Sequence, residues 1–132
     1  MIGALVVTHG QLGKELVAAA MKIVGELPNL KAVSIGWSDN VEQSRAEIQT
    51  ALKAVSSGGG ALILTDMFGG TPCNISLTLM EKDRVEVITG VNLPMIIRLA
   101  SQGDHETVGE LARRVRDQGK RSITMASEML PS

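Results

Sequence analysis

The chain has 132 residues, of which 44% are hydrophobic and 20% charged, with a formal net charge of −1. This length predicts one ordinary domain over residues 1–132, and the composition is that of a globular protein. The near-neutral charge, with one Trp, one Phe and no Tyr, argues against nucleic acid as a partner. Nucleic-acid binding needs a basic surface and aromatic side chains for stacking.

Short apolar runs alternate along the chain with stretches of helical periodicity. The first run is β-branched and bounded by His-Gly, as expected of a strand buried on both faces. Gly25 should end the first helix, and Asp39 should cap the second with Glu42 as its capping-box partner. In chain order the predicted elements are strand 2–8, helix 11–25, strand 30–35, helix 39–55, strand 61–65, helix 72–82, strand 85–89, helices 94–100 and 106–118, and strand 120–126.

The last of these strands is predicted from a different pattern. Ile123 and Met125 stand at alternate positions, which indicates a strand with one face in water. Gly119 is expected to stop the helix that precedes it.

Strands that alternate with helices predict an α/β fold, an open and mostly parallel sheet with helices on both faces. We expect the strand order 2-1-3-4. Ligands of such sheets bind beyond the carboxyl ends of the strands, where the strand order reverses. His9 ends the first strand and Asp66 follows the third, so this order would bring the two side chains face to face.

A glycine turn follows Asp66 and leads into the next predicted helix. Thr71 followed by Pro72 is typical of an N-cap with proline at the first helical position. Gly69 and Gly70 free the backbone to turn successive N–H groups toward one point. These features predict a site for a phosphate or another anion beside a carboxylate. The alternative is a tight strand-to-helix turn without a ligand.

His9 is the candidate nucleophile. A lone histidine at a strand end is more often a satisfied polar residue than a catalyst, but Asp66 and the anion loop favour chemistry here. A carboxylate that accepts the N–H of one imidazole nitrogen fixes the tautomer and leaves the other nitrogen's lone pair free. It also stabilises the ring when the ring becomes cationic. A free imidazole nitrogen beside N–H donors can attack phosphorus, with Gly69, Gly70 and Thr71 holding the phosphoryl oxygens.

Other chemistries fit the sequence less well. It has no Walker-type lysine loop, no Gly-x-Ser-x-Gly turn and no dinucleotide-binding glycine motif. A metal would need a third close ligand, so we expect none; His105 lies in a polar turn and is expected to be plain surface. Cys73 near a helix start could be reactive, but a small packing residue is favoured. The basic cluster at 113–116 is expected to be a solvated helix face rather than a docking surface.

Three stretches lie in order along nearly the whole chain: Leu-Val-Val-Thr-His-Gly at 5–10, Thr-Asp-Met-Phe-Gly-Gly-Thr-Pro-Cys-Asn at 65–74 and Gly-Val-Asn-Leu-Pro-Met at 90–95. Together they resemble the IIA component of the mannose family of the bacterial phosphoenolpyruvate-dependent sugar phosphotransferase system. The resemblance implies a phosphotransferase that works as a phosphocarrier through a phosphohistidine. His9 matches the phosphorylated histidine, Asp66 its paired acid and Thr71 the hydroxyl position beside the phosphate.

The resemblance also implies partners. The histidine-containing phosphocarrier protein would supply the phosphoryl group and a IIB domain would receive it, with membrane IIC and IID components beyond. The family fold exchanges its last strand within a homodimer, and the strand predicted at 120–126, in antiparallel orientation, maps onto that strand. Some family members continue into a fused IIB domain, whereas this chain stops at Ser132, so the acceptor is expected to be another polypeptide. No cofactor is expected, because the incoming group is already activated.

Two alternatives share the same site. One is a regulatory phosphoprotein of an incomplete phosphotransferase system that takes no part in transport. The other is the related phosphocarrier module of dihydroxyacetone kinases, whose subunit usually carries further domains. The sugar cannot be deduced, since the chain would touch only proteins and a phosphoryl group.

A cytoplasmic location is expected for the chain. Its one cysteine, Cys73, excludes an internal disulfide framework and suits a reducing compartment. The apolar N-terminus lacks a preceding basic region and breaks at residues 8–10, so it indicates a first strand and not a signal peptide. No apolar run approaches the roughly 20 residues that span a bilayer.

Overall fold

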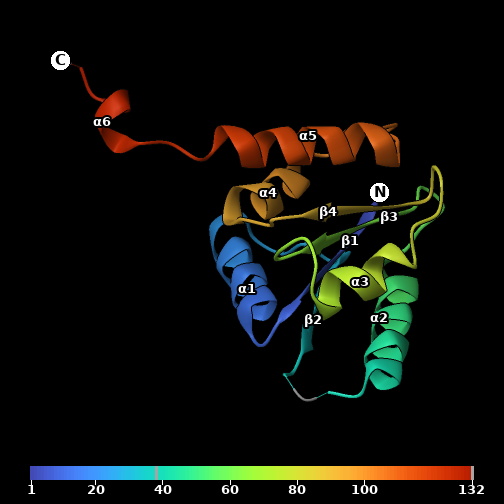
Figure 1. The fold of residues 1–132 in the computed structure, drawn as a ribbon. Coiled ribbons are helices and arrows are strands. Elements are labelled where there is room, and N and C mark those ends of the chain that lie inside the picture. Colours follow the sequence, from blue (N-terminus) through green and yellow to red (C-terminus); the bar gives the residue numbers. More distant parts are fainter. Residues whose placement is uncertain (38, 132) are drawn as a thin grey trace.

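The structure is a computed structural model that describes residues 1–37 and 39–131. Its helices and strands alternate through most of the chain (Figure 1). In order they are β1 (Gly3–His9), α1 (Leu12–Val24), β2 (Leu30–Ile35), α2 (Val41–Val55), β3 (Ala61–Thr65), α3 (Thr71–Leu77), β4 (Val85–Thr89), α4 (Leu93–Arg98), the 3₁₀ turn η1 (Leu99–Ser101), α5 (Val108–Arg121) and α6 (Ala126–Met129).

The four strands form one sheet in the order β2-β1-β3-β4, and every neighbouring pair is parallel. The predicted fold class and strand order are therefore confirmed. Because β1 and β3 are neighbours with connections that leave in opposite directions, their carboxyl ends form the point where the strand order reverses. Both central strands are fully or almost fully buried up to their last residues, as continuous apolar runs in a parallel sheet should be.

Helices cover both faces of the sheet, and two apolar clusters fill the layers between (Figure 1). Val6, Leu62 and Leu64 pack toward α1, α4 and α5, whereas the alternate side chains Leu5 and Ile63 pack toward α2 and α3. The period of two along a strand explains this division. Among the residues described, no helix is both long and apolar enough to cross a membrane.

Three predicted boundaries of α2 and α3 are wrong, for local reasons. Asn40 caps α2, accepting hydrogen bonds from two N–H groups of its first turn, because the Asp39 carboxylate is engaged by the N–H of Gly36. The N-cap of α3 is Gly70, and Thr71 is already helical and makes no capping bond. α3 also ends at Leu77, since a turn at residues 81–85 reverses the chain into β4.

The strand predicted at 120–126 does not form in this chain. α5 runs through Gly119 to Arg121, residues 122–125 are irregular and α6 follows. Gly119 marks close packing and not a helix end: a Cβ there would lie 2.6 Å from the sulfur of Met95. Beyond α5 the chain leaves the domain as an arm, residues 122–131, with no strand of its own chain beside it (Figure 1). A strand needs a hydrogen-bonded neighbour, which alternation of side chains cannot supply.

Candidate active site

His9 and Asp66 meet at the carboxyl ends of β1 and β3. The Nδ1 atom of His9 lies 2.8 Å from Oδ2 of Asp66, and the same oxygen accepts the backbone N–H of His9 at 3.1 Å. The other carboxylate oxygen accepts the N–H of Met67 at 3.1 Å. An ionised carboxylate can only accept, so Nδ1 carries the imidazole proton and Nε2 keeps its lone pair. The predicted pairing of these two side chains is confirmed.

Both side chains of the pair are mostly covered, with 20% of His9 and 12% of Asp66 exposed. Burial of the Asp66 carboxyl opposes its ionisation. The hydrogen bonds from the ring and backbone of His9 outweigh burial and hold the pKa of Asp66 below its ordinary value of 3.8. The carboxylate is therefore ionised at neutral pH and ready to balance a positive charge on the ring.

This pKa shift predicts a pH dependence of stability. A carboxyl whose pKa is lowered on folding stabilises the folded state above its unfolded pKa, and the contribution disappears as pH falls through the folded pKa. The stability that wild type has over Asp66→Asn should thus be present at pH 5 and disappear as pH falls below 3.8. Urea unfolding at several pH values from 5 downward measures this difference in unfolding free energy, with the exposed Asp104→Asn as control. A difference that grows as pH falls below 3.8 would contradict the pairing.

The glycine turn lies against the imidazole. Gly69 and Gly70 have φ values of 81° and 82°, a left-handed conformation that favours glycine. A Cβ at Gly70 would lie 3.1 Å from Cε1 and 3.2 Å from Nε2 of His9, so the turn lies beside the edge of the ring that carries the free nitrogen. Over the described ranges, the N–H groups of Gly69, Gly70 and Thr71 make no hydrogen bond to protein atoms. Thr71 itself is partly buried at the first position of α3.

The structure adds Trp37, which the sequence reasoning missed. Its indole stacks on the His9 ring, with ring centroids 5.0 Å apart and planes inclined by 20°. Its sequence position could have identified Trp37 as a neighbour of His9. Trp37 is the only tryptophan, and it follows the strand next to the one that ends in His9.

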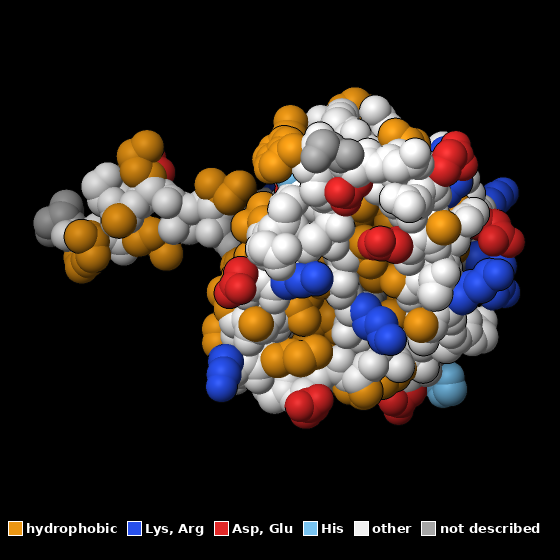
Figure 2. Space-filling model, turned by 90° about the horizontal axis from the view of Figure 1, so that it is seen from below, with side chains coloured by type: hydrophobic (Ala, Val, Ile, Leu, Met, Phe, Trp, Pro, Cys, Tyr) orange, Lys and Arg blue, Asp and Glu red, His pale blue; other side chains and the backbone are white. Residues whose placement is uncertain are grey.

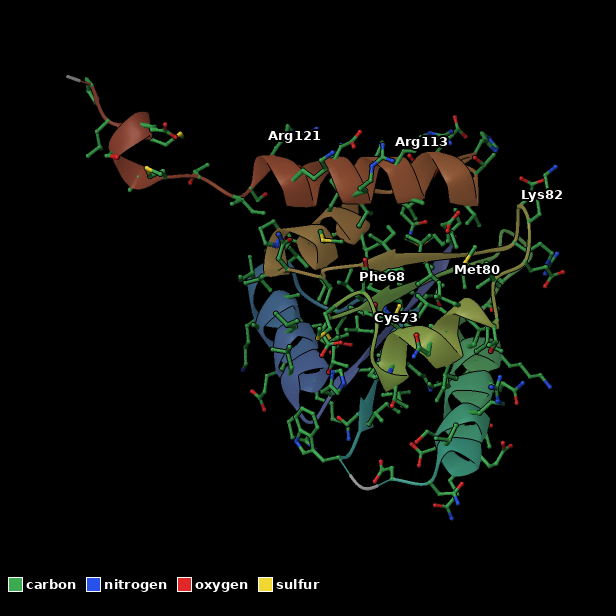
Figure 3. All side chains as sticks on the ribbon, in the orientation of Figure 1. Phe68, Cys73, Met80, Lys82, Arg113 and Arg121 are labelled. Carbon is green, nitrogen blue, oxygen red and sulfur yellow. The ribbon has the colours of Figure 1, made fainter. Side chains whose placement is uncertain are left out.

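Other residues singled out in the sequence are structural or remote. Thr8 accepts the N–H of Gly13 at 2.7 Å and so anchors the start of α1. Cys73 is fully buried between α3 and the sheet, as a packing residue should be (Figure 3). Asn92 caps α4 and donates to the carbonyl of Gly119 at 3.2 Å, which ties α4 to α5.

His105 is exposed and lies near the opposite end of the sheet from His9. The neighbouring Gln102 bonds to both backbone groups of Ile2, at the start of β1, whereas His9 ends that strand. A strand of this length separates the two ends by roughly 20 Å. Within the part of the chain that is described, no three His, Cys, Asp or Glu side chains gather as a metal site requires.

Fold and site together define a small α/β domain that presents an acid-paired histidine where the strand order of its sheet reverses. A family model described as "PTS system fructose IIA component" matches residues 3–116. The chain belongs to the IIA components of the mannose family of the phosphotransferase system, a family of phosphocarriers.

Individual relatives agree with this assignment. A fructose-specific EIIA component of Bacillus subtilis is 29% identical over 98% of this chain and 90% of its own length. A mannose-specific EIIAB component of Escherichia coli K12 is 30% identical over 92% of this chain, which spans only 38% of that longer protein. The solved mannose/sorbose-specific IIA subunit of Enterococcus faecalis is 32% identical, with a TM-score of 0.85 over 99% of this chain and 97% of that one.

Proposed function

We propose that the protein accepts a phosphoryl group on Nε2 of His9 from the histidine-containing phosphocarrier protein. It would then pass the group to a IIB domain, for sugar uptake and phosphorylation through membrane IIC and IID components. The observation that carries the proposal is the 2.8 Å bond between Nδ1 of His9 and Asp66, which commits one ring nitrogen and frees the other. The partners belong to the cytoplasm, and we place the protein there with them.

The transfer is a direct displacement at phosphorus. The lone pair of Nε2 forms the new N–P bond as the P–N bond to the donor histidine breaks, and the donor ring regains its lone pair. His9 keeps the proton on Nδ1, so its ring becomes cationic, and the Asp66 carboxylate balances that charge. In this proposal the amides of Gly69, Gly70 and Thr71, with the Thr71 hydroxyl, bind the phosphoryl oxygens. Two observations support this binding role. Gly70 lies beside the Nε2 edge of the ring, and the N–H groups of Gly69, Gly70 and Thr71 have no hydrogen-bond partner among the described residues.

Reconstitution tests the proposed function. The protein is incubated with labelled phosphoenolpyruvate and the general phosphotransferase enzymes. We expect one acid-labile, base-stable label per chain, and its loss when a IIB protein of the mannose class is added. Omitting the histidine-containing carrier protein is the control and should prevent labelling. A chain that takes no label from the complete mixture would contradict the proposal.

The arm supports a homodimer as the working form. Its apolar side chains have no cover in this chain: Ile123, Met125, Met129 and Leu130 are 65–79% exposed. Figure 2 shows the projecting segment with hydrophobic side chains along it. Several large exposed apolar groups on one short segment indicate an interaction surface.

An open sheet edge offers a matching surface. Among the described residues, β3 is the one strand beside β4. On the other edge of β4, Val85 bonds to Glu81 and the Val87 N–H donates to the Glu86 side chain, and the rest of that edge is open. A groove runs along this edge between β4 and α5, and it is lined by Ile88, Ala112 and Arg113, among others. We propose that the arm of one copy docks at the β4 edge of a second, which a twofold axis would make reciprocal.

Removing the arm should dissociate and destabilise the protein. Because α5 continues to Arg121, the cut is placed after Ser122. Light scattering should give the full chain about twice its 14.0 kDa mass and the truncated chain close to one copy, with a lower melting temperature. Ile123→Asp should also weaken the dimer, whereas Ile23→Asp, at an exposed position on α1, should not. A full chain that is monomeric at micromolar concentration would contradict the dimer.

A further inference from the structure

Trp37 lies beside the reactive histidine because of the sheet register. Ile35, the last residue of β2, is the register partner of His9 in β1, and Trp37 follows it by two residues. The side chain is 86% exposed, yet its indole is stacked on the imidazole. A large aromatic group left so open to water contributes little to the core, so its position calls for another explanation.

The turn after β2 is closed by two hydrogen bonds between Gly36 and Asp39. The N–H of Gly36 donates to the Asp39 carboxylate at 2.6 Å, and the N–H of Asp39 donates back to the Gly36 carbonyl at 3.3 Å. A Cβ at position 36 would lie 2.6 Å from the same carboxylate, so a side chain there would displace it. The pair closes the turn that carries Trp37.

His9 is therefore enclosed by three different restraints. Asp66 fixes the direction of Nδ1 but leaves the ring able to tip about the hydrogen bond. Gly70 lies beside the Cε1–Nε2 edge of the ring, where it leaves no room for a side chain. Trp37 lies against one face of the imidazole, with the two ring planes inclined by 20°.

We propose that Trp37 is a positioning residue for phosphoryl transfer. It holds the plane of the His9 imidazole so that Nε2 meets phosphorus in line. Its π face also stabilises the positive charge that the imidazole acquires as the N–P bond forms. This inference rests on the proposed function. It differs from the simpler idea that an exposed tryptophan beside a reactive group is only a docking contact for partner proteins.

A small phosphoryl donor separates the two roles. With phosphoramidate, Nε2 forms the N–P bond, the donor P–N bond breaks and ammonia leaves, so no protein surface is docked. Trp37→Leu removes the aromatic face, and we expect labelling of His9 to become about 3- to 10-fold slower. Trp37→Phe restores a π face and should recover more than half of the wild-type rate. Met80→Leu, the control, changes an exposed apolar side chain beside the turn at residues 81–85, at the opposite end of the sheet, and should react like wild type.

Proton NMR measures the stacking itself. The carbon-bound ring protons of His9 should resonate upfield of those of His105, because they lie over the indole, and Trp37→Leu should abolish the difference. A Leu variant labelled by phosphoramidate within threefold of wild type, or a Phe variant as slow as the Leu variant, would overturn the inference. If the carrier protein fails to label wild type, the proposed function fails, whereas phosphoramidate still decides the role of Trp37.

Discussion

His9→Ala should take no phosphoryl group from the histidine-containing carrier protein, a complete loss of the activity. The substitution removes the nitrogen whose lone pair forms the N–P bond, and no other group at the ends of β1 and β3 can replace an imidazole. The fold should persist, because His9 stands at a strand end and its backbone N–H still donates to Asp66. Labelling from phosphoenolpyruvate measures the activity, and circular dichroism measures the fold.

His105→Ala is the matched control, since it removes the chain's other imidazole from an exposed turn. It should label like wild type. A His9→Ala protein that still accepts label, together with a His105→Ala protein that does not, would reverse the assignment. His9→Gln adds a further check: it keeps an N–H donor for Asp66 but cannot carry the group.

Asp66→Asn should slow transfer by about 10- to 10⁴-fold while leaving the protein folded. The amide oxygen can still accept the Nδ1 proton, so the hydrogen bond at 2.8 Å has a replacement. What the variant lacks is the negative charge that balances the cationic ring once the N–P bond forms. Single-turnover transfer from the phosphorylated carrier protein measures the rate of this step.

Asp104→Asn removes a carboxylate of the same kind from the exposed turn beside His105, and it should transfer at the wild-type rate. Equal rates for Asp66→Asn and wild type would show that the carboxylate charge has no part in the reaction.

The sheet and the central pair were predictable from the sequence because both follow from local patterns. Apolar runs identify the central strands β1 and β3, and shorter β-branched stretches with polar interruptions identify β2 and β4. In a parallel α/β sheet the carboxyl ends of these strands lie together. With the order β2-β1-β3-β4, residues directly after β3 must lie beside the end of β1. The contact between the side chains of His9 and Asp66 is therefore predictable from the sequence.

The features that were mispredicted or missed depend on contacts between distant segments. The sequence predicts a helix stop at Gly119, but its missing side chain makes room for Met95 of α4. It predicts a helix cap at Asp39, but that carboxylate closes the turn at Gly36. The register of β2 with β1 places Trp37 beside His9, and this register cannot be deduced from a local pattern. Residues 122–125 show the alternation of a strand but have no neighbouring strand in this chain to pair with.

The identity of the phosphorylated nitrogen tests the central claim most directly. Nδ1 of His9 is held by Asp66, so the phosphoryl group must form its bond at Nε2. Long-range ¹H–¹⁵N correlation spectra of the phosphorylated, ¹⁵N-labelled protein distinguish the two ring nitrogens. We predict one phosphohistidine, at Nε2 of His9, with Nδ1 still protonated; a phosphoryl group on Nδ1, or on any other residue, would contradict the account.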